Sequence, residues 1–100
     1  MPLFAVIRRR TERWAFGRPI EAQAEWRAHA GYMDALEAEG FFLLAGPLEQ
    51  DDEVLLIVRA ESTEEVGHRL AADPWTELGL LETVRIAEWT LRVGTLPGTA

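Results

Sequence analysis

His29 is the residue whose neighbours first suggest chemistry. It lies in "EWRAHAGYMDALEAEG", a stretch typical of a helix. At about 100° per residue, its stripe also holds Trp26, Met33 and Leu36, so the imidazole is expected to face the interior. A histidine on an apolar stripe is more often a core residue than a base. Burying an imidazole without a partner is costly, however, so the pattern leaves open a proton-transferring group with a hydrogen-bond partner.

Asp73 is a candidate for that partner, and it precedes Pro74 in "RLAADPWTELGL". An Asp-Pro pair is a common helix start, because the carboxylate caps the backbone amides and proline fits the first helical position. The alternative is a pair between Asp73 and His29. The two interpretations are compatible, since one carboxylate oxygen can cap while the other meets an imidazole.

Other polar and aromatic side chains have simpler interpretations. His68 is expected on a helix surface, and the acids in 49–53 lack calcium-loop spacing and indicate a solvated turn. Arg8, Arg9 and Arg10 end a strand, where a solvated sheet rim is expected, although two of them could line an anion-binding pocket. Packing in the core or an interface is the default for four aromatic residues: Trp14, Phe16, Trp75 and Trp89. The loop that holds the first two could also close a pocket or pad a dimer.

Composition indicates one globular domain over residues 1–100. The chain is 48% hydrophobic and 27% charged, and its formal charge is −7. An acidic chain is a poor partner for nucleic acid or an anionic membrane, so neither is expected. It has no cysteine, which excludes disulfides and thiolate chemistry. There is no secretory signal pattern and no apolar run of about 20 residues, and we expect a soluble cytoplasmic protein.

The elements that must position these residues follow the order strand, helix, strand, strand, helix, strand. Gly40 suits a helix C-terminus, and Ser62 with Glu65 has capping-box spacing. The predicted strands are 2–9, 41–45, 54–60 and 82–93, and the predicted helices are 20–39 and 62–73. A short turn or half-helix is expected at 74–80, and residues 94–100 form a flexible tail outside a core of about 3–93. This order predicts an α+β, ferredoxin-like βαββαβ fold, with a four-stranded antiparallel sheet and two helices on one face.

The predicted strands are apolar on both faces. In the first strand Leu3, Ala5 and Ile7 point one way, while Phe4 and Val6 point the other. Two helices can cover only one face, so the other would be a large exposed apolar patch. We therefore expect a homodimer joined through the sheet face.

Several motifs in this order resemble the YCII-related (YciI-like) domain family. They are "HAGYMDALEAEGFFLLAGPL", "LLIVRAESTEEVGHRLAADPW" and "IAEW", and the resemblance covers roughly residues 3 to 93. It implies a dimeric α+β barrel with a pocket in each protomer, where a His and an Asp that match His29 and Asp73 form a catalytic pair. Some relatives eliminate chloride from chlorinated hydroxylated aromatics. The long loop with Trp14 and Phe16 departs from the family pattern.

Three functions remain open. The first is a small cofactor-independent enzyme in which His29 and Asp73 transfer a proton on a small, cyclic or aromatic substrate, as a lyase, dehydrochlorinase or isomerase. The others are a non-catalytic homodimer that binds a small molecule, and a structural dimer without a ligand. No metal ligand or cofactor-binding residue is predicted. The predicted substrate pocket consists of Trp26, Tyr32, Gly46, Pro47, Trp75 and Trp89.

Overall fold

A computed structural model describes residues 1–49 and 52–96. Its strands are β1 (Leu3–Arg10), β2 (Phe42–Pro47), β3 (Glu53–Arg59) and β4 (Leu81–Trp89). Its helices are the 3₁₀ turn η1 (Ile20–Ala22), α1 (Trp26–Ala38), α2 (Thr63–Ala71) and the one-turn α3 (Pro74–Glu77). No helix in this described part of the chain is long and apolar enough to cross a membrane.

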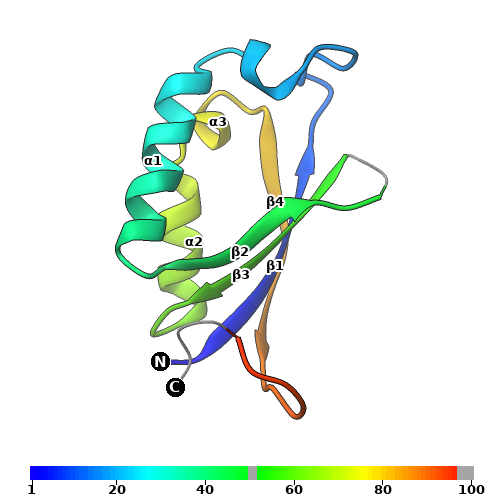
Figure 1. The fold of residues 1–100 in the computed structure, drawn as a ribbon. Helices are drawn as coiled ribbons and strands as arrows, with labels where there is room; N and C mark the ends of the chain where they lie inside the picture. Colours follow the sequence, from blue (N-terminus) through cyan, green and yellow to red (C-terminus); the bar gives the residue numbers. More distant parts are fainter. Residues whose placement is uncertain (50–51, 97–100) are drawn as a thin grey trace.

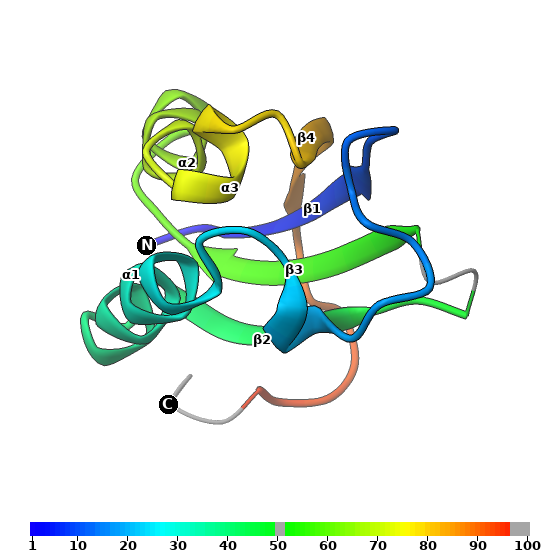
Figure 2. The same ribbon diagram turned by 90° about the horizontal axis from the view of Figure 1, so that it is seen from above.

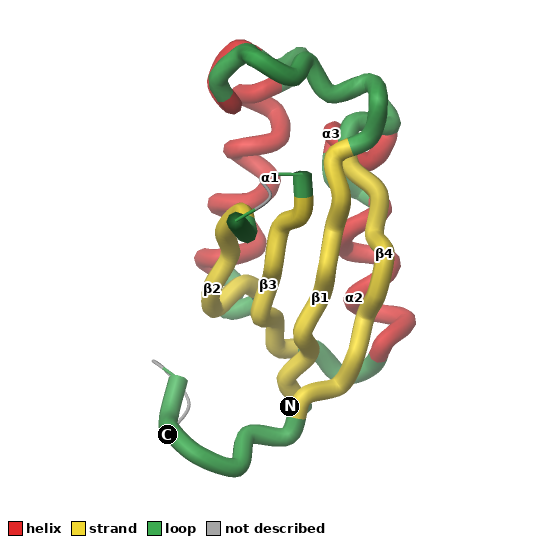
Figure 3. Tube along the Cα trace, turned by 90° about the vertical axis from the view of Figure 1, so that its right-hand side faces the viewer, coloured by secondary structure: helices red, strands yellow, loops and turns green. Residues whose placement is uncertain are grey.

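The strands form one antiparallel sheet in the order β2-β3-β1-β4. Both long helices pack on one face of the sheet (Figures 1 and 2), and the opposite face, seen in Figure 3, carries no helix. This arrangement confirms the predicted α+β, ferredoxin-like βαββαβ fold.

The main core lies between the helices and the sheet. Phe4 and Val6 point from β1 toward the helices and are almost fully buried, because alternate residues of a strand face one side. They pack in one cluster with residues of both helices and of β3: Leu36, Leu56, Val58, Val66 and Leu70. The capping box also forms, with the Ser62 hydroxyl accepting a hydrogen bond from the Glu65 amide at 3.1 Å.

The helix-free face of the sheet carries several apolar side chains, as the alternation in the strands predicted, next to the two arginines that pair with Leu3 and Ile7. Leu3, Ala5 and Ile7 of β1 lie on this face and remain partly exposed. Leu44 and Trp89 also belong to it and are 49% and 41% exposed. The sheet therefore leaves hydrophobic side chains in contact with solvent on one side.

The prediction of one helix over 20–39 is wrong at its start. The segment forms η1, then a turn, and α1 begins only at Trp26. Gln23 is buried and its side chain makes two 2.9 Å hydrogen bonds to the Ala15 backbone, which folds the segment back onto the preceding loop. Glu25 then has φ of 57°, a left-handed conformation that cannot belong to a continuous α-helix.

The last strand is shorter than the predicted 82–93. Trp89 pairs with Leu3, where β1 begins, so the residues after Trp89 have no β1 neighbour to pair with. In the acidic turn predicted at 49–53, Glu49 is exposed and Glu53 starts β3, whereas Asp51 lies outside the described residues. Of the predicted tail 94–100, residues 97–100 lie outside them as well.

Candidate active site

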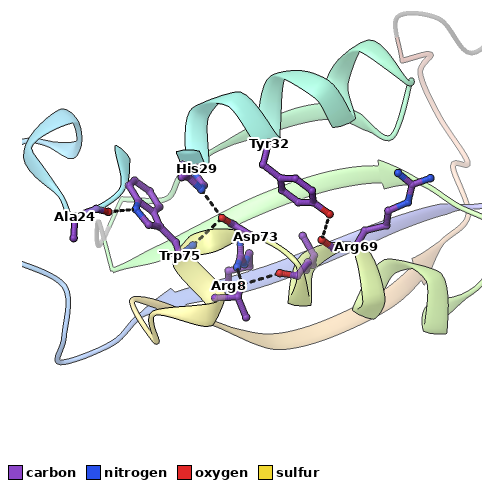
Figure 4. A network of polar contacts seen from close by, with 9 residues as sticks. Arg8, Ala24, His29, Tyr32, Arg69, Asp73 and Trp75 are labelled. Carbon is purple, nitrogen blue, oxygen red and sulfur yellow. Dashed lines mark hydrogen bonds and ion pairs between the residues drawn. The ribbon is translucent and has the colours of Figure 1, made fainter. Parts of the chain in front are cut away.

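Asp73 is the centre of a buried polar cluster, shown in Figure 4. Its Oδ1 lies 2.8 Å from Nδ1 of His29, and its Oδ2 accepts a hydrogen bond from Nη1 of Arg8, also at 2.8 Å. The carboxylate has no exposed surface, and Arg8 and His29 are 1% and 7% exposed. Three chain segments thus meet at one charged group that solvent does not reach.

The start of α3 orients this carboxylate. Asp73 is the N-cap residue, Pro74 occupies the first turn, and Oδ1 accepts a hydrogen bond from the Trp75 amide at 3.0 Å. The predicted capping role and the predicted pairing with His29 therefore occur together. They use the same oxygen, because Arg8 occupies the other.

The expectation that Arg8 lies at a solvated sheet rim is wrong. Arg8 shares the helix-facing side of β1 with Phe4 and Val6, and it is fully buried. Its Nη2 donates to the Thr76 hydroxyl, which in turn donates to the Leu70 carbonyl at 2.7 Å. The strand alternation was the sequence signal for this position, since residues 4, 6 and 8 must point the same way.

Trp75 holds the imidazole of His29 in place. The two rings stack with centroids 3.6 Å apart and an interplanar angle of 8°. The indole of Trp75 is fixed by its Nε1–H bond to the Ala24 carbonyl at 2.6 Å and by edge contact with Trp14 at 4.9 Å. Trp14 is therefore part of a second core cluster, together with Leu80 and Leu81.

A cavity of about 220 Å³ lies beside His29, between α1 and the sheet. Arg10 lines it, and the Cζ atom of Arg10 lies 4.3 Å from the centroid of the Trp14 ring. The other lining residues are Arg8, Trp14, Ile20, His29, Met33, Ala45, Gly46, Pro47, Val54, Leu56, Trp75 and Leu81. Its volume suits a small ring compound in an apolar and aromatic pocket that has a few polar groups.

The predicted pocket residues separate into two groups. Gly46, Pro47 and Trp75 line the cavity. The remaining three, Trp26, Tyr32 and Trp89, do not. The Trp26 ring packs against the His29 ring with centroids 6.1 Å apart. The Tyr32 hydroxyl donates a hydrogen bond to the Arg69 carbonyl at 2.7 Å. Trp89 lies on the helix-free face of the sheet.

The environment of Asp73 favours its ionised form. Burial raises the pKa of this carboxyl, but the hydrogen bonds from His29, Arg8 and the Trp75 amide outweigh burial and hold the pKa below its ordinary 3.8. An ionised carboxylate only accepts hydrogen bonds, so Nδ1 of His29 carries the proton and donates. In a neutral imidazole Nε2 then has a free electron pair, and no side chain or backbone group of the described residues hydrogen-bonds to it.

The lowered pKa of Asp73 predicts a loss of stability in acid. A carboxyl with a depressed folded-state pKa contributes its full stabilisation above its unfolded value, near 3.8, and loses it as the pH falls through the folded value. The difference in unfolding free energy between wild type and Asp73→Asn should therefore be constant above about pH 5 and shrink below about pH 4. Urea unfolding at a series of pH values measures this difference. The exposed Asp34→Asn variant should show no such change, and a difference that grows in acid would contradict the prediction.

The described residues hold other hollows but no second buried polar cluster of this kind. An open depression of about 650 Å³ lies between α2 and β4, lined mostly by small or exposed residues such as Gly67, Ala71 and Thr83. Across residues 1–49 and 52–96, no three His, Cys, Asp or Glu side chains gather as a metal site would require. The cavity beside His29 is therefore the one we consider for chemistry.

Comparisons with known proteins bear on the fold. The model of the YCII-related domain matches residues 3–90. Among solved structures, the chain is similar to 5-chloro-2-hydroxyhydroquinone dehydrochlorinase (TftG) from Burkholderia phenoliruptrix AC1100, in complex with 2,5-dihydroxybenzoquinone. The TM-score is 0.62 and the identity 24%, over 92% of this chain and 95% of that chain, a likeness that shows the shared fold. No curated protein matched the sequence.

Proposed function

Because the chain belongs to the YCII-related domain family, we propose that it is a small cofactor-independent enzyme that transfers protons. In this proposal His29 is the acid-base group and Asp73 its partner, and the substrate is a small cyclic or aromatic molecule. The observation that carries it is the 2.8 Å contact between Nδ1 of His29 and Asp73, which leaves Nε2 for a substrate in the adjoining cavity.

Each residue has a defined part in the proposed reaction. Asp73 keeps the proton on Nδ1 and stabilises the imidazolium that forms when Nε2 accepts a second one. Arg8 and the Trp75 amide hold the carboxylate in position, and the stacked Trp75 ring fixes the plane of the imidazole. These contacts orient Nε2 before the substrate binds, so little rearrangement is needed during proton transfer.

A dehydrochlorination illustrates the chemistry within reach of such a group. In the keto tautomer of a chlorinated hydroxylated ring, in which the chlorine-bearing carbon is saturated, Nε2 removes a proton from a ring hydroxyl. The oxygen then forms a C=O bond, and the neighbouring ring double bond shifts to the chlorine-bearing carbon. Chloride departs with the electrons of the carbon–chlorine bond, so that proton and chloride together account for the HCl lost. The solved relative is named as a dehydrochlorinase. Lyase or isomerase reactions that begin with the same proton transfer use the same residues.

Chloride release tests this proposal directly. Wild-type protein is incubated with 5-chloro-2-hydroxyhydroquinone, the compound in the relative's name, and free chloride is measured against a reaction without protein. Faster release with protein supports the enzyme. Binding without any release, measured by calorimetry with the same compound, would overturn the enzyme and favour the alternative of a non-catalytic small-molecule-binding homodimer.

We also propose that two chains join through the helix-free face of the sheet. Support comes from the exposed apolar side chains on that face, Leu44 and Trp89, which a second copy would cover. Aromatic residues near the centre of an interface often dominate its affinity.

Replacing Trp89 by arginine is therefore expected to weaken the dimer by about 30-fold or more, which corresponds to a typical interface hot spot of about 2 kcal/mol. Sedimentation velocity across a concentration series measures the change. Thr90→Arg adds the same charge one residue beyond the strand and serves as the matched control. A wild-type chain that sediments as a monomer at all concentrations would contradict the proposed dimer.

A further inference from the structure

Arg8 has a hydrogen-bond donor that the protein leaves unused. Its Nη1 donates to Asp73 and its Nη2 to Thr76, but the buried Nε–H has no partner. Buried donors without an acceptor are uncommon, because burial removes their hydrogen bonds to water and no protein group replaces them. Arg8 also lines the cavity beside His29, so a ligand that enters the cavity lies next to the side chain that carries this unused donor.

The described residues that line the cavity carry charges of one sign. Within residues 1–49 and 52–96, the charged lining residues are Arg8 and Arg10, and no Asp or Glu is among them. This is unusual in a chain with a formal charge of −7. Asp73 lies behind His29 and Arg8, fully buried, and it does not line the cavity. A ligand in the cavity therefore faces basic side chains and not the carboxylate.

We infer that the ligand of this cavity is a small planar anion with an ionised oxygen, held by Arg8 and His29. The inference rests on the proposed function and specifies its substrate class as a phenolate or enolate. When a neutral hydroxyl compound of this class enters and Nε2 takes its hydroxyl proton, the trio of Arg8, Asp73 and His29 changes from a net charge of 0 to +1. The ligand that gave up the proton carries −1, so charge is conserved within the cavity and attraction retains the ionised form.

The ionised oxygen is expected to accept from the Arg8 Nε–H and from the protonated Nε2 of His29. Charge-assisted hydrogen bonds of this kind are stronger than neutral ones, especially where solvent is excluded. The ring of the ligand packs on the apolar part of the wall, which Trp14 and Leu56 supply. A neutral ring of the same shape keeps this packing but loses both charged contacts.

A matched pair of ring compounds tests the inference on the wild-type protein. The probes are 2,5-dihydroxy-1,4-benzoquinone, which ionises readily, and 2,5-dimethyl-1,4-benzoquinone, which has groups of similar size and cannot ionise. Isothermal titration calorimetry at neutral pH is expected to show at least tenfold tighter binding of the dihydroxy compound. Covalent addition is limited, because the sequence has no cysteine and no lysine. Equal affinity for the two compounds, or tighter binding of the dimethyl compound, would overturn the inference.

A variant pair links the preference to Arg8. Arg8→Lys keeps a positive charge near Asp73 but has no Nε–H, and it is expected to lose at least tenfold in affinity for the dihydroxy compound. Arg9→Lys is the control, since this neighbouring side chain is 46% exposed and outside the cavity lining. An unchanged preference in a folded Arg8→Lys protein counts against the inference. If that variant does not fold, the comparison of the two compounds on the wild-type protein still tests the inference. Turnover by the His29→Gln variant tests the proposed enzyme separately.

Discussion

Replacing His29 by glutamine is expected to lower the rate of chloride release by about 10²- to 10⁴-fold, the usual contribution of a positioned acid-base group. The glutamine amide can still donate a hydrogen bond to Asp73, but it cannot accept a proton from the substrate and return it. The loss should appear mainly in kcat, because proton transfer occurs in the reaction step, and a smaller rise in KM is expected because the ionised oxygen also loses its hydrogen bond from His29. Steady-state kinetics on 5-chloro-2-hydroxyhydroquinone measure the effect.

The control for this variant is His68→Gln. His68 is the second histidine of the chain and lies exposed on α2, as the sequence predicted. It should retain wild-type turnover, and thermal unfolding of both variants should confirm that each is folded. Wild-type turnover in the His29→Gln protein would refute the acid-base role of His29.

Replacing Asp73 by asparagine is expected to lower the free energy of unfolding by about 3–5 kcal/mol, the usual cost of removing one partner from a buried ion pair. The reason is that Arg8, 1% exposed, then keeps its charge without the opposite charge 2.8 Å away. The amide also fits the cap poorly, since it must present oxygen to both His29 and the Trp75 amide while its NH₂ group faces Arg8. Such a loss is a large part of the stability of a typical domain.

Urea unfolding at neutral pH measures this cost, and a double-mutant cycle assigns its origin. Asp34→Asn, on the exposed side of α1, should change stability by no more than about 0.5 kcal/mol. In Arg8→Met/Asp73→Asn the unpaired charge is removed, so the double variant should lose less than the sum of the single losses. Additive losses, or an Asp73→Asn loss below about 1 kcal/mol, would show that the ion pair does not support the fold.

The sequence predicted the order of elements and the meeting of His29 with Asp73, but it did not predict the role of Arg8. Element order could be read from apolar runs and turn residues, and the pairing of two distant residues came from the family resemblance together with the Asp-Pro motif. Arg8 stands in "RRR", a run that usually marks solvated surface. Its burial depends on a carboxylate 65 residues away in the chain, and strand alternation alone does not indicate a partner at that separation.

Helix and pocket boundaries were harder to predict for a similar reason. Residues 20–25 contain ordinary helix formers, but tertiary contacts of Gln23 override their local preference. Trp89 was predicted in the pocket, yet the pairing of β4 with β1 turns it to the helix-free face. Strand register decides such positions, and register depends on contacts between segments that are far apart in the sequence.

The shared oxygen of Asp73 couples the proposed chemistry to a single backbone amide. Oδ1 contacts Nδ1 of His29 and also accepts from the Trp75 amide, so opening of the first turn of α3 releases the capping bond beside the histidine. Hydrogen–deuterium exchange at the Trp75 amide therefore reports how often this end of the site opens in the native protein. A ligand that tightens the cluster should slow exchange at this amide, which makes it a sensor of occupancy that needs no turnover.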